Sequence, residues 1–395
     1  MAVLKFLSIL LILVLLPFGQ IGKVDLGTIS FTFFDLGVFL LVFYWLVRSI
    51  VKKEKINKGL LGKALTFFIL IGFLSLLINL FNYSPLQLFI SSSYLLRFIL
   101  FAGIYLVFKS FDKSFNNKII KYFFISGIIV LLIGFIQFIF YPNLRNLFYL
   151  GWDEHLYRLF STFLDPNFAG IYFVIIFFTG IYLYKKENNF IYLVFALFTF
   201  IGIFLTYSRS ALVFLIIAAL TYLTIAKKKK LFIGFVSIAV LAIIILPKSF
   251  KTEGTNLFRT ASINERITSM NRGLTVFIDN PLFGVGFNAY RYSQEKYGFI
   301  ESGKNRTSVP NRAGAGVENS FIHILATTGI IGFFAYIYLL WNIGKLFFTK
   351  KNNIYSKTMF PIFIGLIVSG LFINSLFYTF FMFWIFMTAG IIESK

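Results

Sequence analysis

Long apolar runs separated by short polar segments dominate the chain. A helix needs about 20 apolar residues to cross the core of a bilayer. Twelve runs approach that length, at residues 2–19, 32–50, 61–81, 86–108, 120–141, 167–184, 189–206, 210–226, 231–246, 319–345, 358–374 and 376–391. The pattern therefore predicts an all-α, polytopic integral membrane protein with about 12 transmembrane helices.

The spacing of the runs divides the chain into three parts. Residues 1–246 should form the first nine spans, residues 247–318 a large extramembrane loop, and residues 319–395 the last three spans. The first run resembles a signal peptide, but it continues into Pro17 without a small-residue cleavage site. We therefore expect it to be retained as a span.

Composition agrees with a membrane protein and excludes several classes of function. Hydrophobic residues make up 58% of the chain and charged residues only 13%, whereas about 25% is usual for charged residues in soluble domains. These values exclude a cytosolic enzyme and a nucleic-acid-binding protein, although the formal net charge is +22. Because the chain has no cysteine, it has no disulfide, thiolate metal site or cysteine nucleophile.

Lysine and arginine are distributed unequally between the two sides of the membrane. If both termini are cytoplasmic, the cytoplasmic segments hold 22 of the 37 Lys and Arg residues, as the positive-inside rule requires. Only Arg48 among those 22 is an arginine, whereas the outer segments carry nine arginines: Arg145, Arg158, Arg209, Arg259, Arg266, Arg272, Arg291, Arg306 and Arg312. A guanidinium binds phosphate or carboxylate oxygens through two parallel hydrogen bonds, which an ammonium cannot do. The outer surface is thus predicted to hold an anion; arginines that only solvate the loop or contact lipid phosphates are the alternative.

A short amphipathic helix is predicted within the large outer loop. Ser262 and Glu265 have the spacing of a capping box, and apolar residues follow at helical spacing: Ile263, Ile267, Met270, Leu274 and Phe277. We expect a helix at residues 263–278 that lies with its apolar face down. Arg266 should lean inward from the first turn, where free backbone N–H groups add to an anion site, and Arg272 should point into water.

Four short motifs lie on the predicted outer side, three at the ends of spans and one within the large outer loop. They read Phe163-Leu164-Asp165-Pro166-Asn167; Thr206-Tyr207-Ser208-Arg209-Ser210-Ala211; Asn280-Pro281-Leu282-Phe283-Gly284-Val285-Gly286; and Glu318-Asn319-Ser320 running into Ala326-Thr327-Thr328-Gly329-Ile330-Ile331-Gly332. In this order, and with the late outer loop, they resemble the O-antigen polymerase and O-antigen ligase superfamily. The resemblance covers about residues 160–345.

This resemblance implies a metal-independent, inverting-type glycosyltransferase that needs no cofactor and uses a polyprenyl-pyrophosphate-linked oligosaccharide as donor. Polymerases pass the growing chain to the next lipid-linked repeat unit, whereas ligases pass it to a lipid A core. By the resemblance, Arg209 and Arg266 hold the pyrophosphate leaving group and Glu318 is the catalytic base for the acceptor hydroxyl. Ligases typically have a histidine at the position of Glu318, so the glutamate favours a polymerase, with the ligase as the alternative.

The same residues also have structural interpretations. Arg209 would serve as an interfacial anchor, Glu318 as a carboxylate favoured by the helix dipole, and Asp165 as an N-cap before Pro166. The motif glycines Gly284 and Gly286 are expected to shape a turn rather than to touch substrate.

Four further residues are candidates for substrate binding: Arg97, Arg291, Asn319 and Asn167. Arg97 lies near the middle of the fourth predicted span, where a charge is costly. It should therefore face a carboxylate, for which Asp35 is the candidate, or a water-filled cavity. The adjacent residues Asp153, Glu154 and His155 cannot all point at one ion, so we predict no metal site.

The expected partners are the lipid-linked oligosaccharide, the lipid bilayer and a chain-length regulator protein, with no nucleic acid. The expected location is the bacterial inner membrane, with both termini cytoplasmic and the active site outside. A transporter or flippase of lipid-linked sugars is the rival from another class. It is disfavoured because the sequence has no related halves and because its polar residues gather at the outer surface rather than at the midplane.

Overall fold

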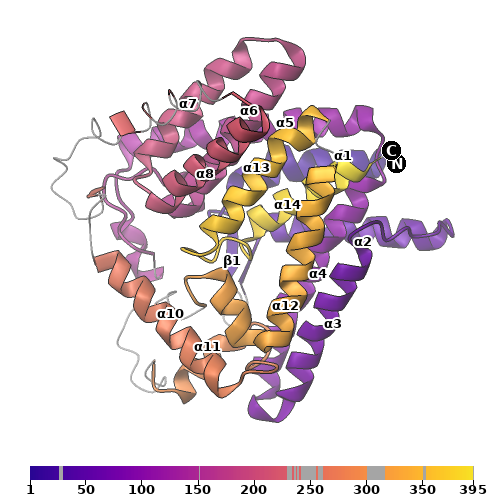
Figure 1. The fold of residues 1–395 in the computed structure, drawn as a ribbon, viewed down its shortest axis with the longest axis vertical. Coiled ribbons are helices and arrows are strands. Elements are labelled where there is room, and N and C mark those ends of the chain that lie inside the picture. Colours follow the sequence, from indigo (N-terminus) through magenta and orange to yellow (C-terminus); the bar gives the residue numbers. More distant parts are fainter. Residues whose placement is uncertain are drawn as a thin grey trace.

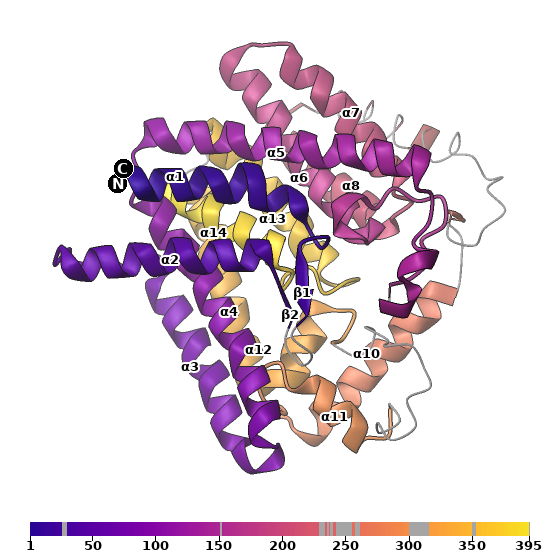
Figure 2. The same ribbon diagram turned by 180° about the vertical axis from the view of Figure 1, so that it is seen from behind.

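Helices make up most of the molecule (Figures 1 and 2). The computed structural model describes residues 1–25, 30–150, 152–228, 261–299, 316–349 and 353–394, together with six single positions between 229 and 260. Within these residues the only strands are β1 (Lys23–Asp25) and β2 (Ser30–Thr32), which pair antiparallel. The all-α prediction is confirmed.

Eleven of the twelve predicted spans coincide with apolar helices. These are α1 (Ala2–Leu10) continued by the π-helix η1 (Leu11–Leu15) and the 3-10 helix η2 (Leu16–Phe18), α2 (Phe33–Val51), α3 (Gly62–Ile78), α4 (Pro85–Lys109), α5 (Lys113–Phe140), α6 (Pro166–Glu187), α7 (Ile191–Leu205), α8 (Arg209–Ile225), α12 (Ser320–Thr349), α13 (Ile354–Ser369) and α14 (Thr379–Glu393). Five of them, α2, α4, α5, α6 and α12, are long and apolar enough to cross a membrane by length and composition. The ninth predicted span, 231–246, lies outside the described residues apart from single positions.

The C-terminal helices form the centre of the bundle. α14 is buried from Thr379 to Ile392 and packs against α4, while α13 packs against α6 and α8. In both views α13 and α14 lie between α5–α8 on one side and α3, α4 and α12 on the other (Figures 1 and 2). The first and last residues lie side by side at one edge of the molecule, and α10 (Ala261–Asp279) lies away from that edge.

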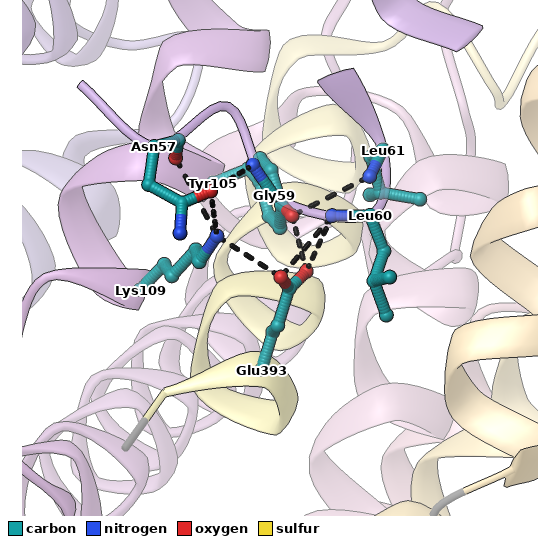
Figure 3. A network of polar contacts seen from close by, with 7 residues as sticks. All are labelled: Asn57, Gly59, Leu60, Leu61, Tyr105, Lys109 and Glu393. Carbon is teal, nitrogen blue, oxygen red and sulfur yellow. Dashed lines mark hydrogen bonds and ion pairs between the residues drawn. The ribbon is translucent and has the colours of Figure 1, made fainter. Parts of the chain in front are cut away.

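A second contact ties the last helix to the early part of the chain (Figure 3). The Glu393 carboxylate accepts hydrogen bonds from the Leu60 backbone N–H, at 3.1 and 3.2 Å, and from the Tyr105 hydroxyl, and it pairs with Lys109 Nζ at 3.0 Å. The Glu393 and Lys109 side chains are only 14% and 16% exposed. The end of α14 is thereby fixed to α4 and to the connection between α2 and α3.

Backbone hydrogen bonds join the motif at residues 280–286 to the motif at residues 318–332, at the point where α12 is broken. Gly329 has φ 66° and ψ −169°, which interrupts the helix. Backbone groups freed by such a break must find other partners inside a membrane protein. The loop before α11 (Tyr290–Lys296) provides them, through Val285 N–H to Ala326 O (3.0 Å), Gly286 N–H to Thr327 O (3.0 Å) and Ile330 N–H to Pro281 O (2.8 Å).

This close backbone contact explains why the motif has a glycine at position 284, which shapes a turn as predicted. Gly284 has φ 64°, and a Cβ atom there would lie 2.4 Å from the Thr327 carbonyl carbon. We expect Gly284→Ala to destabilise the fold by about 1–3 kcal/mol from backbone strain alone, seen as a lower melting temperature of the purified protein. Gly344→Ala is the matched control, because its Cβ would meet only the Phe363 ring at 3.4 Å. Equal melting temperatures for the two variants would contradict this account.

Candidate functional site

The amphipathic helix predicted within residues 247–318 is present as α10 (Ala261–Asp279). It begins two residues before the predicted start, so Ser262 lies in its first turn and is not the N-cap. Arg266 consequently lies in the second turn, and the expectation that first-turn N–H groups join it is wrong. Helix ends depend on flanking residues that periodicity does not detect.

The inward face of α10 differs from the predicted apolar stripe. Met270 and Phe277 are half-buried, but Ile263, Ile267 and Leu274 are 43%, 50% and 36% exposed. The face toward α12 instead centres on Gly273, where a Cβ would lie 2.7 Å from the Ile322 side chain. The missing side chain lets the two helices approach closely, and this close packing decides which face turns inward.

The two arginines of α10 have different environments. Arg266 turns inward, as predicted, and its side chain is 18% exposed. Arg272 does not simply point into water, because its guanidinium lies over the Phe299 ring, 5.5 Å from the centroid. Cation–π contact with an aromatic ring therefore replaces part of its hydration.

An ion pair joins α10 to the residues just before α12. Arg266 Nε donates to Glu318 Oε2 at 3.2 Å, and the Glu318 backbone N–H donates to Ser269 Oγ at 3.2 Å. The Glu318 side chain is 46% exposed, so it is reachable from solution. These two contacts hold the carboxylate at a fixed place beside the guanidinium.

This ion pair lies on the wall of a cavity of about 480 Å³. Four of the seven predicted site residues line it: Glu318, Arg266, Arg97 and Asn167. Arg209, Arg291 and Asn319 are not among the residues that line it. Asp165 and His323, which the sequence interpretation gave no catalytic role, also face this cavity.

Arg209 is the first residue of α8, directly after a tight turn. The turn is held by Arg158, which is 5% exposed and donates from Nε to Thr206 O at 2.9 Å. Asn167 Oδ1 accepts from Ser208 Oγ at 3.0 Å and from Arg158 Nη2 at 3.5 Å. The positive charge of Arg266 acts on the Arg209 guanidinium, so the two cations lie within electrostatic range of each other.

Arg97 was predicted to face either the Asp35 carboxylate or a water-filled cavity, and in the structure it faces both Asp35 and the cavity. Its Nε lies 3.6 Å from Asp35 Oδ1 and its Nη2 donates to Ser30 O at 2.6 Å, while the residue also lines the cavity. The guanidinium of Arg97 lies over the Tyr94 ring at 4.9 Å, and that of Arg291 lies 5.9 Å from the same centroid. Arg291 therefore contacts Tyr94, which lines the cavity, but does not line the cavity itself.

Two carboxyl groups of the cavity have perturbed acidity. Desolvation raises the pKa of Glu318 above its ordinary value of 4.5, and Arg266 opposes that shift. Desolvation also raises the pKa of Asp165, against the N–H of Asn167 and the charges of Arg158 and Arg266. Shifted pKa values in a cleft are typical of groups that exchange protons during a reaction.

Asp165 and Asn319 both make helix-capping contacts. Asp165 Oδ1 accepts from the Asn167 N–H at 2.7 Å, with Pro166 at the first helical position, as predicted. Asn319 Oδ1 accepts from the N–H groups of Phe321 and Ile322 at 2.9 and 3.0 Å, and Nδ2 donates to Leu371 O. These contacts occupy the Asn319 amide, and its binding role stays a prediction.

The adjacent residues Asp153, Glu154 and His155 do not all face one site. Asp153 and His155 line the cavity, whereas Glu154 pairs with Arg145 at 3.4 Å. In the part of the chain that the structure describes, no three His, Asp or Glu side chains gather as metal ligands.

Sequence reasoning missed the roles of Arg158 and His323. Arg158 acts through backbone carbonyls 48 and 49 residues away, and a sequence pattern does not encode such contacts. Its one available signal was its place among the outer arginines. His323 lies in the first turn of α12, which begins at Ser320, and lines the cavity.

Comparison with known proteins finds a family similarity in one part of the chain. The family model described as O-antigen ligase matches residues 193–337, a segment that contains Arg209, Arg266 and Glu318. A search of curated proteins finds no match. The match over residues 193–337 supports the resemblance of this chain to the O-antigen polymerase and ligase superfamily.

Proposed function

We propose that this protein is a polysaccharide polymerase, an inverting glycosyltransferase that joins polyprenyl-pyrophosphate-linked oligosaccharide repeat units on the outer face of the inner membrane. The observation that carries the proposal is the Arg266–Glu318 pair on the wall of the 480 Å³ cavity. It brings together a base for an acceptor hydroxyl and a cation for a phosphate leaving group.

The reaction is a single displacement at the anomeric carbon of the donor. The Glu318 carboxylate takes the proton of the acceptor hydroxyl, whose oxygen forms the new glycosidic bond as the bond to pyrophosphate breaks on the opposite face. Negative charge then develops on the leaving oxygen. Arg266, with Arg209 in electrostatic range, stabilises that charge.

Donor binding and base strength are coupled through the ion pair. In the free protein Arg266 lowers the pKa of Glu318 against the effect of desolvation. When the pyrophosphate oxygens accept hydrogen bonds from the Arg266 guanidinium, the Glu318 carboxylate loses part of this stabilisation, and its pKa rises. Glu318 therefore becomes a stronger base once the donor is bound.

The residue at position 318 favours the polymerase over the ligase. Ligases of the resembled superfamily typically have a histidine there, and this chain has a glutamate. The ligase is the second candidate, because the matching family model is itself described as O-antigen ligase.

Reconstitution of the purified protein in liposomes tests the proposal. With the lipid-linked repeat unit as the sole sugar substrate, a polymerase forms a ladder of longer lipid-linked chains. Product that requires a lipid A core would identify a ligase. Movement of the lipid-linked sugar across the bilayer without a new glycosidic bond would identify a transporter.

The proposed location requires α10 and the N-terminal end of α5 to lie on opposite sides of the membrane. Because the chain has no cysteine, single cysteines in place of the exposed residues Lys118 and Asn264 give clean reporters. We expect an impermeant thiol reagent to label Asn264→Cys in intact cells and Lys118→Cys only after the membrane is opened. Labelling of both in intact cells would contradict the topology.

A further inference from the structure

We infer that the inner part of the cavity is a binding subsite for an uncharged sugar ring of the lipid-linked oligosaccharide. The inference rests on the proposed function and deepens it. We call this part the His323 subsite; its residues are Gly316, His323, Asn374 and Phe377, all of which line the cavity.

Two polar atoms of the subsite have no partner in the described residues. They are His323 Nδ1 and Asn374 Oδ1, and His323 is only 6% exposed. Polar atoms buried in native proteins are almost always hydrogen-bonded. Two such atoms at the wall of one cavity mark a place where a ligand supplies hydrogen-bonding groups.

Gly316 leaves open the space between these two side chains. A Cβ atom on Gly316 would lie 3.5 Å from His323 Nδ1 and 3.6 Å from Asn374 Nδ2. His323 Nδ1 and Asn374 Nδ2 therefore both face the position that a methyl group on Gly316 would take, and the unpartnered Asn374 Oδ1 belongs to the same amide. Those contacts are ordinary van der Waals distances, so the backbone accepts alanine there.

The surroundings suit a sugar better than a second phosphate. The ring of Phe377 lies 6.0 Å from that of His323, and Phe168 and Tyr378, which also line the cavity, stack at 4.0 Å. Aromatic rings, an imidazole and an amide match a pyranose, which has apolar C–H faces and hydroxyl groups that both donate and accept. The charged residues Arg266 and Glu318, with Arg97, Asp153 and Asp165, also line the same cavity.

Binding measurements with two lipid probes test the inference. The probes are polyprenyl pyrophosphate without sugar and the lipid-linked repeat unit extracted from a strain that lacks this protein. We expect Gly316→Ala and Asn374→Leu to weaken binding of the repeat unit by about 10- to 200-fold and to leave binding of polyprenyl pyrophosphate unchanged. Gly344→Ala, far along α12, is the control and should leave both affinities unchanged.

The outcomes separate the subsite from the proposed function. If both variants bind the lipid-linked repeat unit as tightly as the unchanged protein, the inference is overturned. If the unchanged protein binds both probes equally, it is overturned as well. If the unchanged protein binds the repeat unit but never extends it, the proposed function fails, whereas the subsite is supported by the loss of binding in the two variants.

Discussion

Replacing Glu318 by glutamine is expected to lower the polymerisation rate by about 100- to 10,000-fold, the usual contribution of a general base. Glutamine keeps the shape of the side chain but cannot take the acceptor's proton. Folding and donor binding should therefore be nearly preserved. The measurement is chain extension by the purified variant with the lipid-linked repeat unit, together with its affinity for polyprenyl pyrophosphate.

The pH dependence gives an independent check on the same residue. A general base must be deprotonated, so activity should fall as the pH is lowered through the pKa of Glu318, which desolvation raises above 4.5. Glu318→His should retain partial activity, which declines below about pH 6.5 as the imidazole becomes protonated. Full activity in Glu318→Gln would leave Glu318 as a helix-terminal carboxylate without a catalytic role.

Arg266→Lys and Arg209→Lys are each expected to reduce polymerisation by roughly 10- to 150-fold, which corresponds to the loss of about 1.5–3 kcal/mol from a charge-assisted hydrogen bond. Lysine keeps the charge but loses the two parallel N–H groups that fit a phosphate. The measurement is the initial rate of chain extension at saturating acceptor.

Arg272→Lys is the matched control on the same helix. Arg272 lies over the Phe299 ring rather than on the cavity wall, and a lysine retains part of that contact. A loss of activity as large as that of Arg266→Lys would refute the anion site. A loss in Arg266→Lys without one in Arg209→Lys would restrict the anion site to α10.

The sequence was sufficient to predict the spans and the central ion-pair residues. Apolar runs identify membrane helices because the bilayer requires internally satisfied backbone and an apolar exterior, and eleven runs match helices. Arg266 and Glu318 were found through their motifs, and the fold places them 3.2 Å apart. The partner of Arg97 was found because a charge inside a span must be compensated.

The features that sequence reasoning missed depend on tertiary packing. Which face of α10 turns inward depends on the fit of Gly273 against Ile322, and periodicity contains no information on that fit. The role of Arg158 depends on carbonyl groups of the turn at Thr206 and Tyr207, which any residue type could supply. His323 reaches the cavity because the chain enters α12 only after Glu318.

The cavity walls come from across the whole chain, and this has a consequence for how such enzymes diverge. Arg266, Glu318 and His323 lie within the matched segment 193–337, whereas Tyr94, Arg97 and Asn374 of the same cavity lie outside it. Under the proposed function, the sugar-binding wall is divided, with Gly316 and His323 inside the matched segment and Asn374 and Phe377 outside it. We therefore expect proteins that share the matched segment to differ in the outside part of that wall. Exchange of the flanking helices between relatives would then alter which repeat unit is joined without rebuilding the reaction.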